Sequence, residues 1–201
     1  MADVMKAASA RHADFEGRHA PDIPDDILWQ YVVEADFVWQ SILYVLYVAG
    51  LRAKAIRYFR RNRIYVPKKR MWKKESLEFV VRIDKTRKRR ALRAILQLPK
   101  EWDWIPQPPT DQTWQFFAEG DAEERLFEGV TASDINSELR KMSARLNLPR
   151  PTTYSFRRAY INRIIPLVNN KKQLTEFTLH FETSTVDAFY MRTRADKNKM
   201  E

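Results

Sequence analysis

The sequence predicts one mostly helical α+β domain that carries a small antiparallel sheet. Helical apolar patterns occupy both ends of the chain, and one central stretch alternates apolar with charged residues. With 201 residues, 44% of them hydrophobic, the chain is long enough for one domain with a packed core. We expect a flexible N-terminal segment over residues 1–23, the folded domain over 24–192 and a flexible tail over 193–201.

Two adjacent helices begin the predicted domain. The first opens at Pro24, because proline followed by two aspartates favours the first helical turn. The second covers Phe37 to Ala49 and is apolar over most of its length, which predicts a buried helix too short to cross a membrane. Gly50 is expected to end this helix as a left-handed cap. Arg52 therefore lies at a turn beside the core.

The central part of the chain predicts a β-hairpin. Residues 77–83 follow the two-residue period of a half-buried strand, and residues 91–98 supply a partner strand. The hairpin connection is then 85–90, and 62–66 could form another short strand. Residues 100–120 contain three tryptophans and three prolines without any period, so we expect a long surface connection there.

The last third of the chain predicts a series of helices. Residues 133–146 place apolar side chains at helical spacing along one face. Three more helices are expected at about 155–165, 172–179 and 184–191. The architecture is therefore mostly helical, with the sheet as a small addition.

Basic residues are concentrated in one part of the chain. The net charge is +10, and residues 52–100 alone hold 19 Lys and Arg against 3 Asp and Glu. Such a charge can simply form a solvated face, but here three basic runs bracket short apolar segments, which favours a surface that binds phosphates. The candidate nucleic-acid-binding residues are Arg57, Arg60, Arg61, Lys68, Lys69, Arg87, Lys88, Arg89 and Arg158.

The residue types present exclude several kinds of site. Cysteine is absent, which removes disulfides, thiolate metal sites and cysteine nucleophiles. The chain has no glycine-rich phosphate loop and no metal-ligand motif, so we expect neither a cofactor nor a metal. The first twenty residues lack the apolar stretch of a secretory signal. We expect an intracellular protein, in a nucleus, an organelle, or a viral or bacterial cytoplasm.

Five short motifs resemble, in the right order, those of the tyrosine recombinases, the phage-integrase family. The resembling segments are a glycine-leucine-arginine turn at 48–52, a hairpin lysine motif at 83–91, an arginine-containing second box at 151–158, a histidine element at 178–180 and a tyrosine-containing run at 184–190. Together they cover roughly residues 25–192. The resemblance implies the catalytic-domain fold of this family.

The resemblance also implies a role for each matching residue. Arg52 and Arg157 would hold the non-bridging oxygens of a scissile phosphate, where charge builds in the transition state. Lys85 would protonate the leaving 5′ oxygen, and His180 would assist at the phosphate or the nucleophile. Tyr190 would attack in line to give a covalent 3′-phosphotyrosine, without a metal.

This sequence departs from the family pattern in three respects. Tyr154 stands where the second box usually has histidine, although a phenol can still donate a hydrogen bond to phosphate. Phe189 occupies the usual position of the nucleophile and Tyr190 comes one residue later, a shift that turns a helical side chain by about 100°. In the histidine element only His180 is kept, because Thr178 takes the usual leucine position and Leu179 the usual glycine position. Beyond these three departures, we also expect no N-terminal DNA-clamping domain of the kind that most family members carry.

These features leave two main functions open. One is site-specific cleavage and rejoining of duplex DNA through a phosphotyrosine intermediate, as in a recombinase or integrase. The other is a catalytically degenerate recombinase fold that binds nucleic acid, DNA or RNA, or serves as a structural subunit of a larger assembly. A basic scaffold without a nucleic-acid role is a third reading. We expect self-assembly on DNA or membership of a larger complex, and no association with a membrane.

Overall fold

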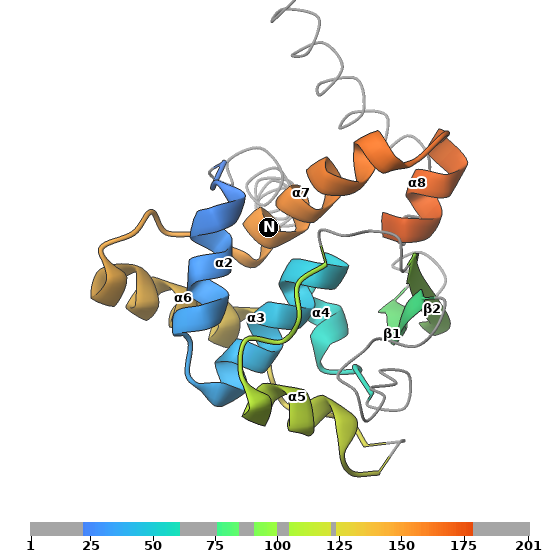
Figure 1. The fold of residues 1–201 in the computed structure, drawn as a ribbon. Coiled ribbons are helices and arrows are strands. Elements are labelled where there is room, and N and C mark those ends of the chain that lie inside the picture. The colour runs from blue at the N-terminus through green and yellow to red at the C-terminus, as the bar shows by residue number, and fades with distance from the viewer. Residues whose placement is uncertain (1–21, 61–75, 85–90, 100–104, 122–123, 179–201) are drawn as a thin grey trace, which may run out of the picture.

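The computed structural model describes residues 22–60, 76–84, 91–99, 105–121 and 124–178 (Figure 1). The elements within these ranges are α2 (Asp25–Glu34), α3 (Phe37–Ala49), α4 (Ala53–Ile56), β1 (Ser76–Asp84), β2 (Ala91–Pro99), α5 (Asp111–Ala118), α6 (Ala132–Leu146), α7 (Thr153–Ile164), the 3-10 turn η2 (Ile165–Leu167) and α8 (Lys171–Thr178). The prediction of a mostly helical architecture is confirmed. Among the residues described, no helix is both long and apolar enough to span a membrane.

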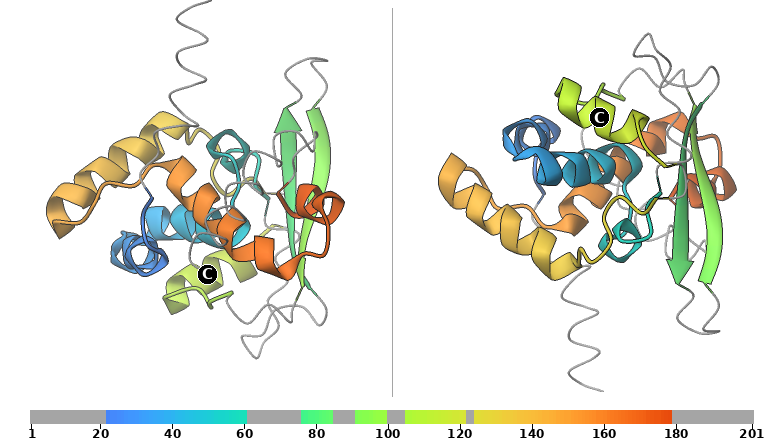
Figure 2. Two further views of the ribbon diagram at one scale, coloured as in Figure 1. Left: turned by 90° about the horizontal axis from the view of Figure 1, so that it is seen from above. Right: turned by 90° about the horizontal axis from the view of Figure 1, so that it is seen from below.

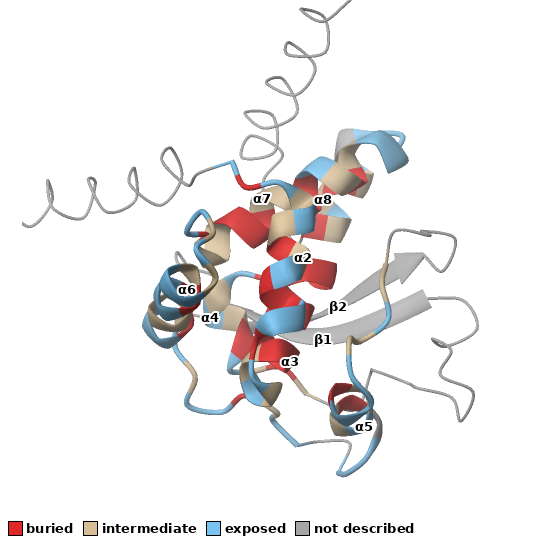
Figure 3. Ribbon diagram, turned by 60° about the vertical axis from the view of Figure 1, so that its left-hand side comes forward, coloured by how far each residue is buried: buried red, intermediate tan, exposed pale blue. Residues whose placement is uncertain are grey.

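Helix α3 forms the centre of the core, with α2 and α7 packed against it (Figure 3). Every residue from 40 to 49 is buried, as expected for a helix that is apolar on all sides. Its polar groups find partners: the Tyr44 hydroxyl donates to the carbonyl of Pro106 at 2.8 Å, and Gln40 Nε2 donates to the carbonyl of Val33 at 3.1 Å. The buried helix therefore carries its polar side chains without leaving them unsatisfied.

The two strands form a separate layer at one side of the helices. Strands β1 and β2 pair antiparallel, with Ser76 opposite Pro99 and Asp84 opposite Ala91. Figure 2 shows this ribbon standing along one side of the helical body, with α6 on the opposite side. Strand β1 lies next to α4, and strand β2 lies next to α8.

Helix α5 contradicts the expectation of an irregular connection over residues 100–120. The helix begins where the Thr110 side chain accepts a hydrogen bond from the Thr113 amide at 3.2 Å. Its Phe117 side chain is fully buried, with its ring centre 6.4 Å from that of Phe59. The prediction was wrong because a helix of eight residues is stabilised by such tertiary packing, which hydrophobic periodicity does not reveal.

Several predicted segments lie partly or wholly outside the described residues. Ile23, which falls in the segment expected to be flexible, is only 7% exposed and belongs to the core. The expected short strand over 62–66 and the expected helix over 184–191 lie outside the described residues. The same is true of most of the segment 1–23 and of the whole tail 193–201.

Candidate phosphate-binding site

The turn after α3 brings Arg52 to the surface beside α7. Gly50 adopts the left-handed conformation with φ +55°, and its amide donates to the carbonyl of Leu46 at 3.0 Å, which confirms the predicted cap. A Cβ atom on Gly50 would lie 2.7 Å from the Cβ of Tyr160, so the α7 side chain packs directly on the turn. Glycine is required here both by the backbone angle and by this close approach. The chain then leaves the core, and Arg52 is exposed.

The first turns of α7 carry two of the predicted site residues. Thr152 and Ser155 form a reciprocal capping box, which satisfies the free amides at the start of the helix and fixes its direction. Tyr154 and Arg157 follow three residues apart, a spacing that places them on the same face of a helix. That face is turned toward the end of α3, because α3 and α7 pack together.

Arg157 is buried and binds two chain segments that are remote in sequence. Its side chain is 6% exposed; Nη1 donates to the carbonyl of Gly50 at 2.6 Å, and Nη2 donates to the carbonyl of Thr178 at 2.7 Å. Burial, together with the nearby charge of Arg52, lowers the pKa of Arg157 to about 9, which still leaves the guanidinium charged at neutral pH. Arg157 therefore ties the end of α3 to the end of α8.

Arg52, Tyr154 and Arg157 form one electrostatic cluster. Partial desolvation lowers the pKa of Arg52, while Tyr154 acts in the opposite direction on the pKa values of both arginines. Exposure decreases from Arg52 through the half-buried Tyr154 to the buried Arg157. The charge of Arg52 opposes that of Arg157, and an anionic oxygen group placed at the cluster would relieve this repulsion. The arrangement is therefore suited to binding phosphate.

Other predicted site residues cannot be placed in this cluster. The residues outside the described part of the chain are Lys85, His180, Tyr190, Arg61, Lys68, Lys69, Arg87, Lys88 and Arg89. The described elements do lead to them: β1 ends one residue before Lys85, and α8 ends at Thr178, two residues before His180. Because Thr178 accepts a hydrogen bond from Arg157, the segment that enters the histidine element begins at the cluster.

Three more of the predicted basic residues are described. Arg158 forms an ion pair with Asp22, with 3.3 Å between Nη2 and Oδ2, and both side chains are exposed. Arg57 is exposed and Arg60 is partly exposed, both just after α4. Their roles in binding nucleic acid remain predictions.

Sequence reasoning missed Tyr160, which packs against the turn that positions Arg52. Its ring is fully buried against Gly50, and its hydroxyl donates to the carbonyl of Phe177 at 3.0 Å. The available signal was its spacing: Tyr160 follows Arg157 by three residues, so both side chains lie on the helix face that is turned to the core.

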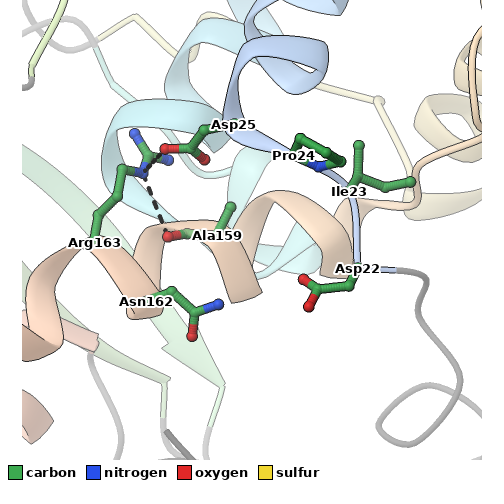
Figure 4. A pocket seen from close by; sticks show the side chains of 7 residues that line it. All are labelled: Asp22, Ile23, Pro24, Asp25, Ala159, Asn162 and Arg163. Atoms are coloured by element: carbon green, nitrogen blue, oxygen red, sulfur yellow. Dashed lines mark hydrogen bonds and ion pairs between the residues drawn. The ribbon is translucent and has the colours of Figure 1, made fainter. Parts of the chain in front are cut away.

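A hollow lies between the start of α2 and helix α7 (Figure 4). The cavity measures about 290 Å³, and its lining residues are Asp22, Ile23, Pro24, Asp25, Ala159, Asn162 and Arg163. Arg163 Nε lies 3.2 Å from Asp25 Oδ2, and Arg163 Nη2 donates to the carbonyl of Tyr47 at 2.8 Å. These contacts join α2, α3 and α7, which indicates a structural role. Within the described ranges, no group of His, Asp and Glu could hold a metal ion.

The Asp25–Arg163 pair predicts a specific effect of pH. Burial raises the pKa of Asp25 above its usual 3.8, and the opposing effect of Arg163 is smaller. The folded protein then binds more protons than the unfolded chain at pH values above 3.8, so this carboxyl contributes less stability as the pH rises through that window. The unfolding free energy of wild type minus that of Asp25→Asn should therefore fall as the pH rises above 3.8. Urea titrations at several pH values would measure it, and a difference that rises would contradict the assignment.

Solved structures of similar fold include a transposon integrase and a recombinase. The Tn1549 transposon integrase in complex with a circular intermediate DNA has a TM-score of 0.52 and 13% identity, covering 90% of this chain and 67% of the integrase chain. The same integrase with transposon right end DNA has a TM-score of 0.52 and 14% identity, covering 90% and 67%. The XerA recombinase has a TM-score of 0.58 and 12% identity, covering 90% and 65%.

These similarities show the fold of the chain. It is the catalytic-domain fold of the tyrosine recombinases and integrases, and the chain spans about two thirds of the length of the chains it matches. No protein-family model matches the sequence, and no curated protein does.

Proposed function

We propose that this chain, which has the tyrosine-recombinase catalytic-domain fold, binds duplex DNA and holds one backbone phosphate at Arg52, Tyr154 and Arg157. The observation that carries the proposal is the meeting of these residues, which belong to motifs more than 100 residues apart, in one electrostatic cluster. Arg52 offers an exposed guanidinium with paired donors, the geometry that best recognises phosphate oxygens. Tyr154 can donate a further hydrogen bond from its hydroxyl.

Two observations support duplex DNA as the partner. The integrase structures of similar fold are in complex with DNA. The segment that follows Arg52 is also the most basic in the chain, with 19 Lys and Arg among residues 52–100. Each phosphate contact made by such residues releases counterions, so binding should weaken steeply as salt is added.

The finer proposal is strand cleavage and rejoining by this site. The two arginines would stabilise the charge that develops on the phosphate oxygens in the transition state. Tyr190 would attack the phosphorus and form a 3′-phosphotyrosine bond, while the bond from phosphorus to the 5′ oxygen breaks. Lys85 would give its proton to that departing oxygen, and His180 would assist at the phosphate. A later attack by a 5′ hydroxyl would reverse these steps and release the tyrosine.

Trapping the covalent intermediate tests this proposal. The chain would be incubated with a nicked suicide duplex, whose cleaved strand loses the 5′ hydroxyl needed for rejoining, and separated under denaturing conditions. Wild type is expected to form a protein–DNA adduct, and Tyr190→Phe none, since that variant lacks only the phenolic oxygen. Arg52→Ala should slow adduct formation by about 100-fold or more, because a donor to the transition-state oxygens is removed.

A second candidate function is nucleic-acid binding without cleavage. It is favoured by Phe189 at the usual position of the nucleophile, and by the two Arg157 nitrogens that are engaged with backbone carbonyls. Phe189→Tyr distinguishes the two candidates. An adduct from this variant but not from wild type would identify a disarmed recombinase. An adduct that maps to a residue other than Tyr190 would contradict the cleavage proposal, and no adduct from either protein would leave binding alone.

A further inference from the structure

Two arginines lie against a single tyrosine ring at the end of α4. The guanidinium carbon of Arg57 is 4.7 Å from the centre of the Tyr58 ring, and that of Arg125 is 5.7 Å from the same centre. Arg57 and Arg125 are exposed, and Tyr58 is partly exposed. We refer to Arg57, Tyr58 and Arg125 as the Tyr58 cluster.

Backbone contacts hold the two halves of the Tyr58 cluster together. Arg60 and Arg125 form an isolated antiparallel bridge, and the amide of Leu126 donates to the carbonyl of Phe59 at 3.1 Å. The rings of Phe59 and Phe127 stack with their centres 5.8 Å apart. The segment that carries Arg125 is therefore fixed beside the end of α4 by the core, and not by the arginines themselves.

The position of Arg125 is unexpected from the charge pattern. Residues 101–130 hold eight acidic residues, and Arg125 is their only Lys or Arg. The fold places this single cation at the same tyrosine ring as Arg57, which belongs to the most basic segment of the chain. Two guanidinium groups near one ring repel each other, and an anion that contacts both would remove that repulsion.

Tyr58 prepares the cluster for such an anion. A guanidinium held near an aromatic ring is attracted to the ring and loses some of its freedom before any ligand arrives, so less entropy is lost on binding. Arg125 forms an ion pair with the carboxylate of Glu128, with 3.1 Å between Nη1 and Oε1. That pair is exposed, 37% for Arg125 and 72% for Glu128, and exposed ion pairs contribute little, so a polyanion can displace Glu128.

We infer that the Tyr58 cluster binds a second backbone phosphate of the nucleic acid, in addition to the phosphate proposed at Arg52. Arg52 precedes α4 and Arg57 follows it, five residues later. Arg57 of the Tyr58 cluster is therefore separated from Arg52 along the chain only by the short helix α4. The inference rests on the proposed function for its partner.

Glu128 provides a test that leaves the arginines in place. Glu128→Gln removes the competing carboxylate and should strengthen binding of the full chain to a labelled duplex DNA by about threefold beyond its matched control. The control is Glu138→Gln in α6, which makes the same charge change in an i,i+3 pair with Lys141 at 3.2 Å. Arg125→Ala should weaken binding by about fivefold and reduce the log-log salt slope by about one. The gain from Glu128→Gln should vanish in the Arg125→Ala background.

The outcomes separate this inference from the proposed function. Equal affinities for Glu128→Gln and Glu138→Gln, with wild-type binding by Arg125→Ala, would overturn the inference, whatever adduct formation shows. The same titrations with a labelled single-stranded RNA test RNA as the alternative partner. If Glu128→Gln strengthens the binding of RNA but not of duplex DNA, the cluster is a backbone-phosphate site and duplex DNA is not its partner. If the chain binds neither probe, both proposals are overturned.

Discussion

Replacing Arg157 by methionine is expected to lower the free energy of unfolding by about 3 kcal/mol, because two charge-assisted hydrogen bonds of about 1.5–3 kcal/mol each are lost while the cost of burying a charge is relieved. Methionine fills similar space, but it leaves the carbonyls of Gly50 and Thr178 without their donor. Arg157→Lys should recover part of the loss at most, since one ammonium does not reproduce the planar fork that reaches both carbonyls. Urea unfolding followed by circular dichroism at neutral pH would measure these differences.

The adjacent arginine supplies the control. Arg158 pairs with Asp22 at 3.3 Å, with side-chain exposures of 38% and 74%. An exposed pair of this kind contributes about 0–1 kcal/mol, so Arg158→Met should change stability little. Equal effects of the two substitutions would mean that the Arg157 bridge does not stabilise the fold. If only the Arg157 variant loses much stability, the effect of that substitution on DNA cleavage must be measured under conditions where the variant is still folded.

Gly50→Ala is expected to lower the free energy of unfolding by about 3 kcal/mol, combining about 1–2 kcal/mol of left-handed backbone strain with about 1–3 kcal/mol of overpacking. The added methyl group would collide with the ring of Tyr160, which is fully buried and cannot move aside freely. The melting temperature and the urea midpoint should both fall. Arg52 should also be displaced, because the same turn positions it.

Gly129 separates the two contributions to this loss. It also has a positive φ of +85°, but a Cβ atom there would meet nothing within 4 Å. Gly129→Ala should therefore show backbone strain alone, about 1–2 kcal/mol. If both alanine variants lose the same stability, the contact between Gly50 and Tyr160 is not a source of strain.

The predictable part of the fold is the part that rests on local patterns. The apolar run that forms α3 and the glycine that ends it were evident because burial on all sides and a left-handed cap each leave a mark in the sequence. Helix α5 left no such mark, since its cap and its contact with Phe59 depend on segments far along the chain. Tertiary packing decided that element, and the local sequence did not.

The candidate site was predictable only through the order of its motifs. Periodicity placed Arg52 at a turn and Arg157 on a helix, but nothing local indicates that the two side chains approach each other. The resemblance to a family of known chemistry supplied that expectation. It did not indicate that Arg157 would bind two backbone carbonyls, or that Arg125 would join the basic segment, because such contacts depend on the exact packing of the chain.

The bridge made by Arg157 also has a consequence for folding during synthesis, because its two acceptors leave the ribosome at different times. One of its acceptors lies 107 residues earlier in the chain, and the other lies 21 residues later. A nascent chain that has emerged through α7 already contains Arg52, Tyr154 and Arg157, yet the carbonyl of Thr178 is still inside the ribosome. Contacts of such long sequence separation form late, after the entropy of closing the intervening loop has been overcome. Both hydrogen bonds of Arg157 are therefore present only after α8 has been made and has docked.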